Sequence, residues 1–136
     1  MNPTEFIRTS KRLTEIADCE GDLRSAVSRA YYGALHACLD ALPTEFAPTT
    51  ERMMQLESHR AVIDAMEVWG RLPGAGRLNA QFAARAISKL KRSRVNADYR
   101  IVDQWMIDAT QCIAEAERIV DLVSEARAQR DKAKQG

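Results

Sequence analysis

The sequence predicts an all-α fold, an up-and-down bundle of about five helices, and three observations support this. Good helix formers such as Ala, Leu, Arg, Glu and Met dominate most of the chain. The six glycines and four prolines cluster at a few breaks. No segment alternates apolar and polar residues over the length of a strand. With 136 residues, the chain is long enough for one domain with its own hydrophobic core.

The first two helices are predicted from the spacing of apolar residues and from the break between them. Pro3 suits a helix start, and apolar side chains then recur every three or four residues. This pattern predicts a first helix over about Thr4–Asp18, and Gly21 ends it. Asp22 is a suitable N-cap for a second helix over about Leu23–Leu42.

The middle of the chain is predicted to hold a loop, a third helix and a second loop. Residues 43–53 are polar and contain two prolines, which favours a loop. The third helix is expected to begin at Leu56 or Ser58 and to end at Trp69. The clearest loop of the chain follows, because it contains Gly70, Pro73, Gly74 and Gly76.

Two longer helices and a short tail are predicted for the rest of the chain. The fourth helix covers about Asn79–Ala97, and the fifth covers about Asp103–Arg127 with an apolar stripe along it. Residues 129–136 are charged and poor in apolar side chains, so we expect a frayed, flexible tail there. The helical domain would then span residues 1–128.

Charge is distributed unevenly along a chain whose net charge is only +1. Residues 71–100 contain eight basic residues and one acidic residue, whereas residues 40–67 contain six acidic and two basic residues. A basic stripe attracts phosphates by electrostatic steering and by the release of counterions. The same stripe is compatible with a solvated helix face, or with pairing to the acidic segments.

Two of the predicted helices carry polar stripes at helical spacing. On the second helix the stripe lies opposite a face rich in alanine, and small residues there favour close helix packing. A solvated face would be richer in Lys and Glu, so we interpret this stripe as a groove or a polar interface. The second helix carries Ser25, Arg29, Tyr32, His36 and Asp40, and the fourth carries Arg85, Lys89, Arg92 and Asn96.

Arg94 departs from the basic stripe of its own helix, because helical spacing places it on the apolar face with Ile87 and Leu90. An arginine there must be paired, or must extend its charged end to water. Asp98 follows four residues later and is within reach of an ion pair. That pair could fix the end of the helix, or it could hold the Arg94 guanidinium ready for a phosphate.

The chain contains LRSAVSRAYYGALHA at residues 23–37, SHRAVI at residues 58–63 and RVNADY at residues 94–99. Together these segments resemble small stand-alone HEPN (higher eukaryotes and prokaryotes nucleotide-binding) proteins of bacteria and archaea. Residues 23–37, LRSAVSRAYYGALHA, resemble the S-R-x-Y-Y-A signature of this family. Residues 94–99, RVNADY, resemble the R-x-x-A-D-Y segment that ends its fourth helix, and residues 58–63 are similar to the histidine-led start of its third helix. The matches follow in family order and span about residues 20–100.

The resemblance implies an α-helical bundle that forms a homodimer and binds RNA or nucleotides. It also implies a place in a bacterial toxin–antitoxin or defence system, with a nucleotidyltransferase or an antitoxin as possible partner. Many HEPN proteins are metal-independent ribonucleases with an R-x4–6-H motif. The corresponding segment here offers Arg94, Asp98 and Tyr99 as the candidate catalytic residues, without the histidine. Tyrosine is a poor general base near neutral pH.

The leading interpretation is therefore a binding module with a degenerate or weak ribonuclease site. The residues expected to contact nucleic acid are Arg29, Tyr32 and His36 on the second helix and Arg85, Lys89, Arg92 and Asn96 on the fourth. A second interpretation is an active metal-independent endoribonuclease that uses Arg94 with Tyr99, or with His36 or His59 supplied from elsewhere in the fold. A third is a structural module whose groove holds a helix of another protein.

The composition also argues against several classes of site. Three cysteines without a C-x-x-C spacing, and only two histidines, predict neither a disulfide framework nor a metal site. No cofactor motif is visible. The sequence contains no long apolar run, and its first residues lack the plan of a signal peptide. We therefore expect a cytoplasmic protein that does not enter membranes.

Overall fold

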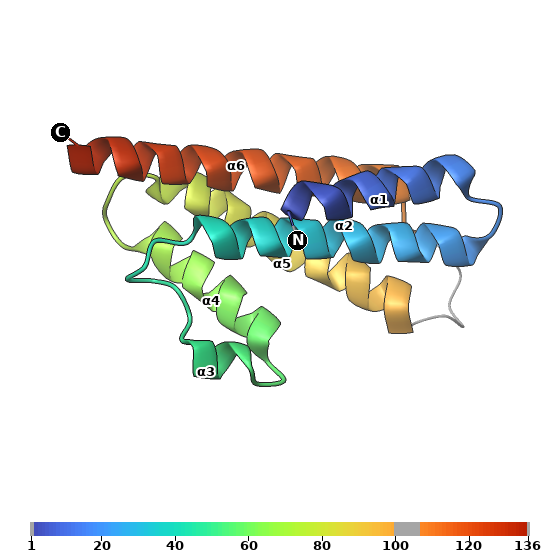
Figure 1. Ribbon diagram of the computed structural model, residues 1–136, viewed down its shortest axis with the longest axis horizontal. Coiled ribbons are helices and arrows are strands. Elements are labelled where there is room, and N and C mark those ends of the chain that lie inside the picture. The colour runs from blue at the N-terminus through green and yellow to red at the C-terminus, as the bar shows by residue number, and fades with distance from the viewer. Residues whose placement is uncertain (1, 100–106, 136) are drawn as a thin grey trace.

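The computed structural model (Figure 1) describes residues 2–99 and 107–135, and every regular element within them is an α-helix. The predicted all-α bundle is thus confirmed. The described helices, in chain order, are α1 (Pro3–Ile16), α2 (Glu20–Ala41), α3 (Thr50–Met53), α4 (Ser58–Arg71), α5 (Arg77–Tyr99) and α6 (Ala109–Gln135).

Helix α2 is the centre of the bundle, because it packs against α1, α4, α5 and α6. Helices α1, α2 and α6 run side by side along the long axis in Figure 1, with α5 behind α2. The inner face of α2 is made largely of small side chains, as the alanine pattern predicts, and this lets the neighbouring helices approach closely. Its fully buried residues are Ala26, Val27, Ala30, Tyr31, Ala34 and Cys38.

Helices α4 and α5 meet at a close seam that bears on the candidate site. At Gly70, a Cβ atom would lie 2.7 Å from the Cα atom of Gln81 on α5. Only glycine leaves room for this approach, so the backbones of the two helices touch there. Leucine and alanine side chains of α5 continue the packing towards α2 and α6.

The start of α2 differs from the prediction. The helix begins at Glu20, with Cys19 in the extended N-cap position, so Asp22 lies inside the first turn. Its carboxylate instead accepts a hydrogen bond from the backbone nitrogen of Asp18 at 3.2 Å. Asp22 therefore organises the turn that precedes the helix, and its negative charge also favours the helix N-terminus.

The loop predicted for residues 43–53 is correct only in part, because it ends in the short helix α3. Thr49 caps this helix, since its hydroxyl accepts a hydrogen bond from the backbone nitrogen of Arg52 at 3.1 Å. The signal is a threonine followed by good helix formers, which is too short a pattern for periodicity to detect.

Helix α6 continues to Gln135, so the frayed tail predicted for residues 129–136 is wrong over its helical part. Two side chains explain why the helix continues. Arg127 forms an ion pair with Asp131 and donates to the carbonyl of Ala41, which ends α2. Arg130 forms an ion pair with Glu45. The predicted start of this helix at Asp103 lies outside the described residues.

No helix in the described part of the chain is both long enough and apolar enough to cross a membrane.

Gly70→Ala should lower the free energy of unfolding by about 1–3 kcal/mol, because the new methyl group forces α4 and α5 apart. Denaturant unfolding measures the change. Gly21→Ala is the matched control, because a Cβ atom there meets only Cys19 Sγ at 3.7 Å. That substitution should stabilise the chain by about 0.4–1 kcal/mol. Equal stability of the two variants would contradict the close seam.

Candidate functional site

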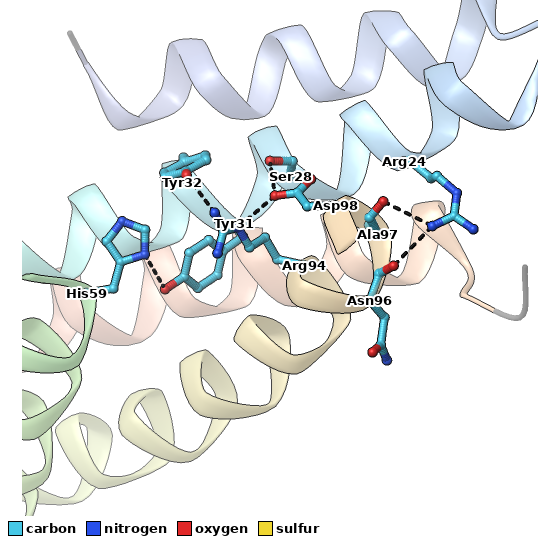
Figure 2. Close-up of polar contacts among 9 residues, drawn as sticks. All are labelled: Arg24, Ser28, Tyr31, Tyr32, His59, Arg94, Asn96, Ala97 and Asp98. Carbon is cyan, nitrogen blue, oxygen red and sulfur yellow. Dashed lines mark hydrogen bonds and ion pairs between the residues drawn. The ribbon is translucent and has the colours of Figure 1, made fainter. Parts of the chain in front are cut away.

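The side chain of Arg94 is held among aromatic rings from two helices and is only 13% exposed. Its guanidinium carbon lies 5.7 Å from the ring centre of Tyr31, 5.4 Å from that of Tyr32 and 5.6 Å from that of Tyr99. Figure 2 shows Arg94 reaching from α5 towards the two tyrosines of α2. These rings favour the cation through their negative faces, which offsets part of the cost of burying it.

Two polar partners fix the orientation of the Arg94 guanidinium. Its Nη2 donates a hydrogen bond to the hydroxyl of Tyr32 at 3.0 Å, and its Nε lies 2.9 Å from a carboxylate oxygen of Asp98. The Nε–H bond does not point at that oxygen, so the contact with Asp98 is an ion pair without a hydrogen bond. Ser28 Oγ also donates to Asp98, at 3.4 Å. The predicted Arg94–Asp98 pair is confirmed.

Electrostatics keep Arg94 charged. Burial disfavours the charged form, but Tyr32, Asp98 and Tyr99 outweigh that effect and raise the pKa of Arg94 above its usual value. The Nη1 group has no hydrogen-bond partner within the described residues. The cation is therefore oriented by Asp98 and Tyr32 while part of its hydrogen-bonding capacity is unused.

Arg94 lines a hollow of about 610 Å³ between α4, α5 and the segment around α3. We call it the Arg94 hollow. Lys91 lines it as well and has no carboxylate within ion-pair distance in the described ranges. Its other residues are Arg52, Leu56, Glu57, His59, Arg60, Asp64 and Tyr99.

The acidic residues of the Arg94 hollow are partly neutralised. Asp64 accepts from Arg52 at 3.3 Å and from Arg60 at 3.2 Å, so one carboxylate serves two guanidinium groups. The ion pair of Arg52 with Asp64 also joins α3 to α4. The hollow is lined by more basic side chains (Arg52, Arg60, Lys91 and Arg94) than acidic ones (Glu57 and Asp64), and this excess of positive charge favours an anion there.

His59, in the first turn of α4, faces the same hollow. Its Nδ1 lies 3.4 Å from the hydroxyl of Tyr31, and the edge of its ring contacts Tyr32 with the ring centres 5.5 Å apart. Burial lowers the pKa of His59 from 6.5, and the nearby charges of Arg94 and Lys91 lower it further. The imidazole is therefore neutral near pH 7 and can accept a proton.

Several predicted site residues come together around Arg94. Tyr32 from α2 binds it directly, and Asp98 and Tyr99 contact it from its own helix. Tyr99 is 69% exposed, so one face of its ring is open to a ligand while the ring also contacts Arg94. The candidate catalytic segment is therefore one cluster.

Other predicted residues lie apart from that cluster. The ring of His36 stacks on Phe6 of α1, with the ring centres 5.2 Å apart and the planes 6° from parallel. Arg29 is exposed on α2. The side chain of Asn96 points away from Arg94 in Figure 2, and its backbone carbonyl accepts from Arg24 at 3.0 Å. Lys89 is exposed, and Arg85 and Arg92 line a different hollow.

Sequence reasoning missed two residues of the cluster. Tyr31 is not among the predicted site residues, yet it is fully buried and contacts both Arg94 and His59. Lys91 belongs to the basic stretch but lies off the predicted stripe. Spacing within one helix carries no signal for these contacts, because they join α2, α4 and α5.

The lowered pKa of His59 predicts a pH-dependent stability. The unfolded chain binds the His59 proton more readily than the folded chain. The free energy of unfolding should therefore fall as the pH drops below about 6.5 towards the lowered pKa of His59. At higher pH His59 is neutral in both the folded and the unfolded chain, and the full stability is retained. Denaturant unfolding over about pH 5–8 measures it.

His59→Gln should make that pH dependence shallower, while His36→Gln, the matched removal of the other histidine, should retain the His59 contribution. An identical pH dependence in His59→Gln and the parent would show that His59 titrates alike in the folded and unfolded chain.

Comparison of the chain with protein-family models, with curated proteins and with solved structures found no match. The resemblance to HEPN proteins therefore rests on the three motifs quoted above and stays a prediction.

Proposed function

We propose that the chain is a HEPN-type module that binds nucleic acid or nucleotides, in a bacterial toxin–antitoxin or defence system. The observation that supports this most is the Arg94 hollow, where Arg94 and Lys91 both line the wall and, among the described residues, neither the Nη1 group of Arg94 nor the ammonium of Lys91 has a polar partner. Guanidinium groups present a planar set of donors that matches a phosphate, and charge-assisted hydrogen bonds of this kind are strong.

The hollow also offers a surface for a base. Tyr99 and Leu56 line it and are both exposed. Stacking of a base on an aromatic ring contributes about 1–3 kcal/mol and tolerates any sequence. A phosphate bound to Arg94 and Lys91, with its base on Tyr99, would therefore use the oriented cation, the lysine and the exposed aromatic ring of the hollow.

The arrangement of Arg94 favours binding because its orientation exists before the ligand arrives. Asp98 and Tyr32 restrict the side chain, so little rotamer freedom remains to be lost on binding. The same contacts keep the buried charge paired in the free chain, and a phosphate would add to that pairing rather than replace it.

A second candidate function, a metal-independent endoribonuclease, is favoured by one observation: His59 shares the hollow with Arg94. The segment after Arg94 lacks a histidine, but α4 supplies one. In this reaction the neutral His59 takes the proton of a ribose 2′-hydroxyl as its oxygen attacks phosphorus. The 5′-oxygen leaves with a proton from water, which yields a cyclic phosphate. Arg94 stabilises the charge that develops on the phosphate oxygens.

The homodimer and the nucleotidyltransferase or antitoxin partner remain predictions from the resemblance.

Arg94→Gln should weaken the binding of a labelled single-stranded RNA by about tenfold or more, because a charge-assisted hydrogen bond is worth about 1.5–3 kcal/mol. Fluorescence anisotropy at low salt measures the affinity, and circular dichroism checks that the variant folds. Arg12→Gln, on the exposed side of α1, removes the same charge far from the hollow and should have little effect. Equal losses of RNA affinity in both variants would show that binding depends on the net charge of the chain and not on the position of Arg94.

If the second candidate is right, the parent cleaves RNA in EDTA and His59→Gln slows cleavage by about 10²–10⁴-fold, the usual contribution of a general base. Tyr99→His restores the family spacing after Arg94 and should then cleave at least as fast as the parent. An inactive parent with intact RNA binding would refute the nuclease and leave the binding function standing.

A further inference from the structure

A second hollow, of about 590 Å³, lies between the end of α4 and residues 77–92 of α5, and four arginines line it. We call it the four-arginine hollow. Its other residues are Glu67, Gly70, Gln81, Ala84 and Ser88, and its arginines are Arg71, Arg77, Arg85 and Arg92.

The charges of this hollow are not neutralised by the protein. None of its four arginines forms an ion pair within residues 2–99 and 107–135, and Glu67 is the one carboxylate among its lining residues there. Four guanidinium groups around one hollow repel each other and create a strong positive potential. Such a cluster is stable in the free chain only because it is open to water, and an anion would relieve the repulsion.

Arg77 shows most directly that stability does not account for the cluster. It is the first residue of α5, and the helix dipole disfavours a cation at that end. Arg71, in contrast, lies in the last turn of α4, where a cation is favoured. The two side chains nevertheless border the same hollow, which points to a shared anionic ligand.

The two hollows follow one another along the α4–α5 seam. Asp64 lines the Arg94 hollow and Glu67, one turn further along α4, lines the four-arginine hollow. On α5, Lys91 lines the first and Arg92 lines the second. From Arg77 to Arg94 the helix rises by about 25 Å, at about 1.5 Å per residue. The residues that line the two hollows are therefore neighbours on both helices, although Arg94 projects from a different face of α5 than Arg85 and Arg92.

The two hollows differ in whether an aromatic side chain lines them, and this difference indicates which part of a nucleotide each hollow would bind. Tyr99 offers a ring in the Arg94 hollow, whereas no aromatic side chain is among the described residues that line the four-arginine hollow. The second hollow is therefore suited to phosphates and not to bases.

We propose that the four-arginine hollow binds the sugar-phosphate backbone of a single-stranded RNA whose neighbouring nucleotides occupy the Arg94 hollow. This inference rests on the proposed function. It adds a second subsite, a direction for the strand along the α4–α5 seam, and a dependence of affinity on strand length.

The test compares RNA oligonucleotides of about 4 and about 12 nucleotides, within the range of known single-strand sites. Arg71→Gln combined with Arg77→Gln should leave the affinity of the short oligonucleotide unchanged and weaken the long one at least severalfold. The log–log salt slope for the long strand should become shallower by roughly 1.4, at about 0.7 per lost phosphate contact.

The matched control is Arg8→Gln combined with Arg12→Gln on α1, which lowers the net charge equally and should affect neither length. Inorganic polyphosphate, which has the charge without ribose or base, is a third probe. Unchanged binding of the long strand by the Arg71/Arg77 variant would overturn the proposal, whether or not polyphosphate binding falls. In that case short-strand binding in the parent would still uphold the proposed function. A parent that binds neither length would overturn both.

Discussion

The candidate site depends on one half-buried cation, Arg94, held between α2 and α5. A guanidinium that is 13% exposed would be costly if it were unpaired, yet Asp98, Tyr32 and three aromatic rings surround it. Removal of Asp98 would leave the Arg94 guanidinium without its ion pair, and removal of the Tyr32 hydroxyl would leave Nη2 without its hydrogen-bond acceptor. The cluster therefore behaves as a unit, and it fixes the end of α5 against the middle of α2.

The small residues of α2 make that cluster possible. Alanine at positions 26, 30 and 34 lets neighbouring helices approach closely, so the tyrosines that follow on the same helix reach across to α4 and α5. Gly70 does the same for the α4–α5 seam. Close backbones bring His59, Lys91 and Arg94 to the rim of one hollow, although they come from two helices. Packing thus concentrates positive charge locally in a chain with a net charge of only +1.

Periodicity and composition were sufficient to predict the helical class, the alanine face of α2 and the Arg94–Asp98 pair, because each is local in sequence. The contact of His59 with Tyr31 spans 28 residues and depends on how α4 crosses α2, which no local pattern encodes. The continuation of α6 to Gln135 was missed for a related reason. The ion pair of Arg130 with Glu45, from a distant loop, helps to hold residues whose composition alone suggests fraying.

The central claim is that a phosphate binds beside Arg94 and His59, and the chain has only two histidines, so imidazole NMR tests it most directly. In the free chain the pKa of His59 is expected below 6.5, and a bound phosphate should raise it, because an anion favours the imidazolium. We predict that a short single-stranded RNA shifts the His59 resonances and raises this pKa in the parent, but not in Arg94→Gln. Unchanged His59 resonances in a chain saturated with that RNA would contradict the account.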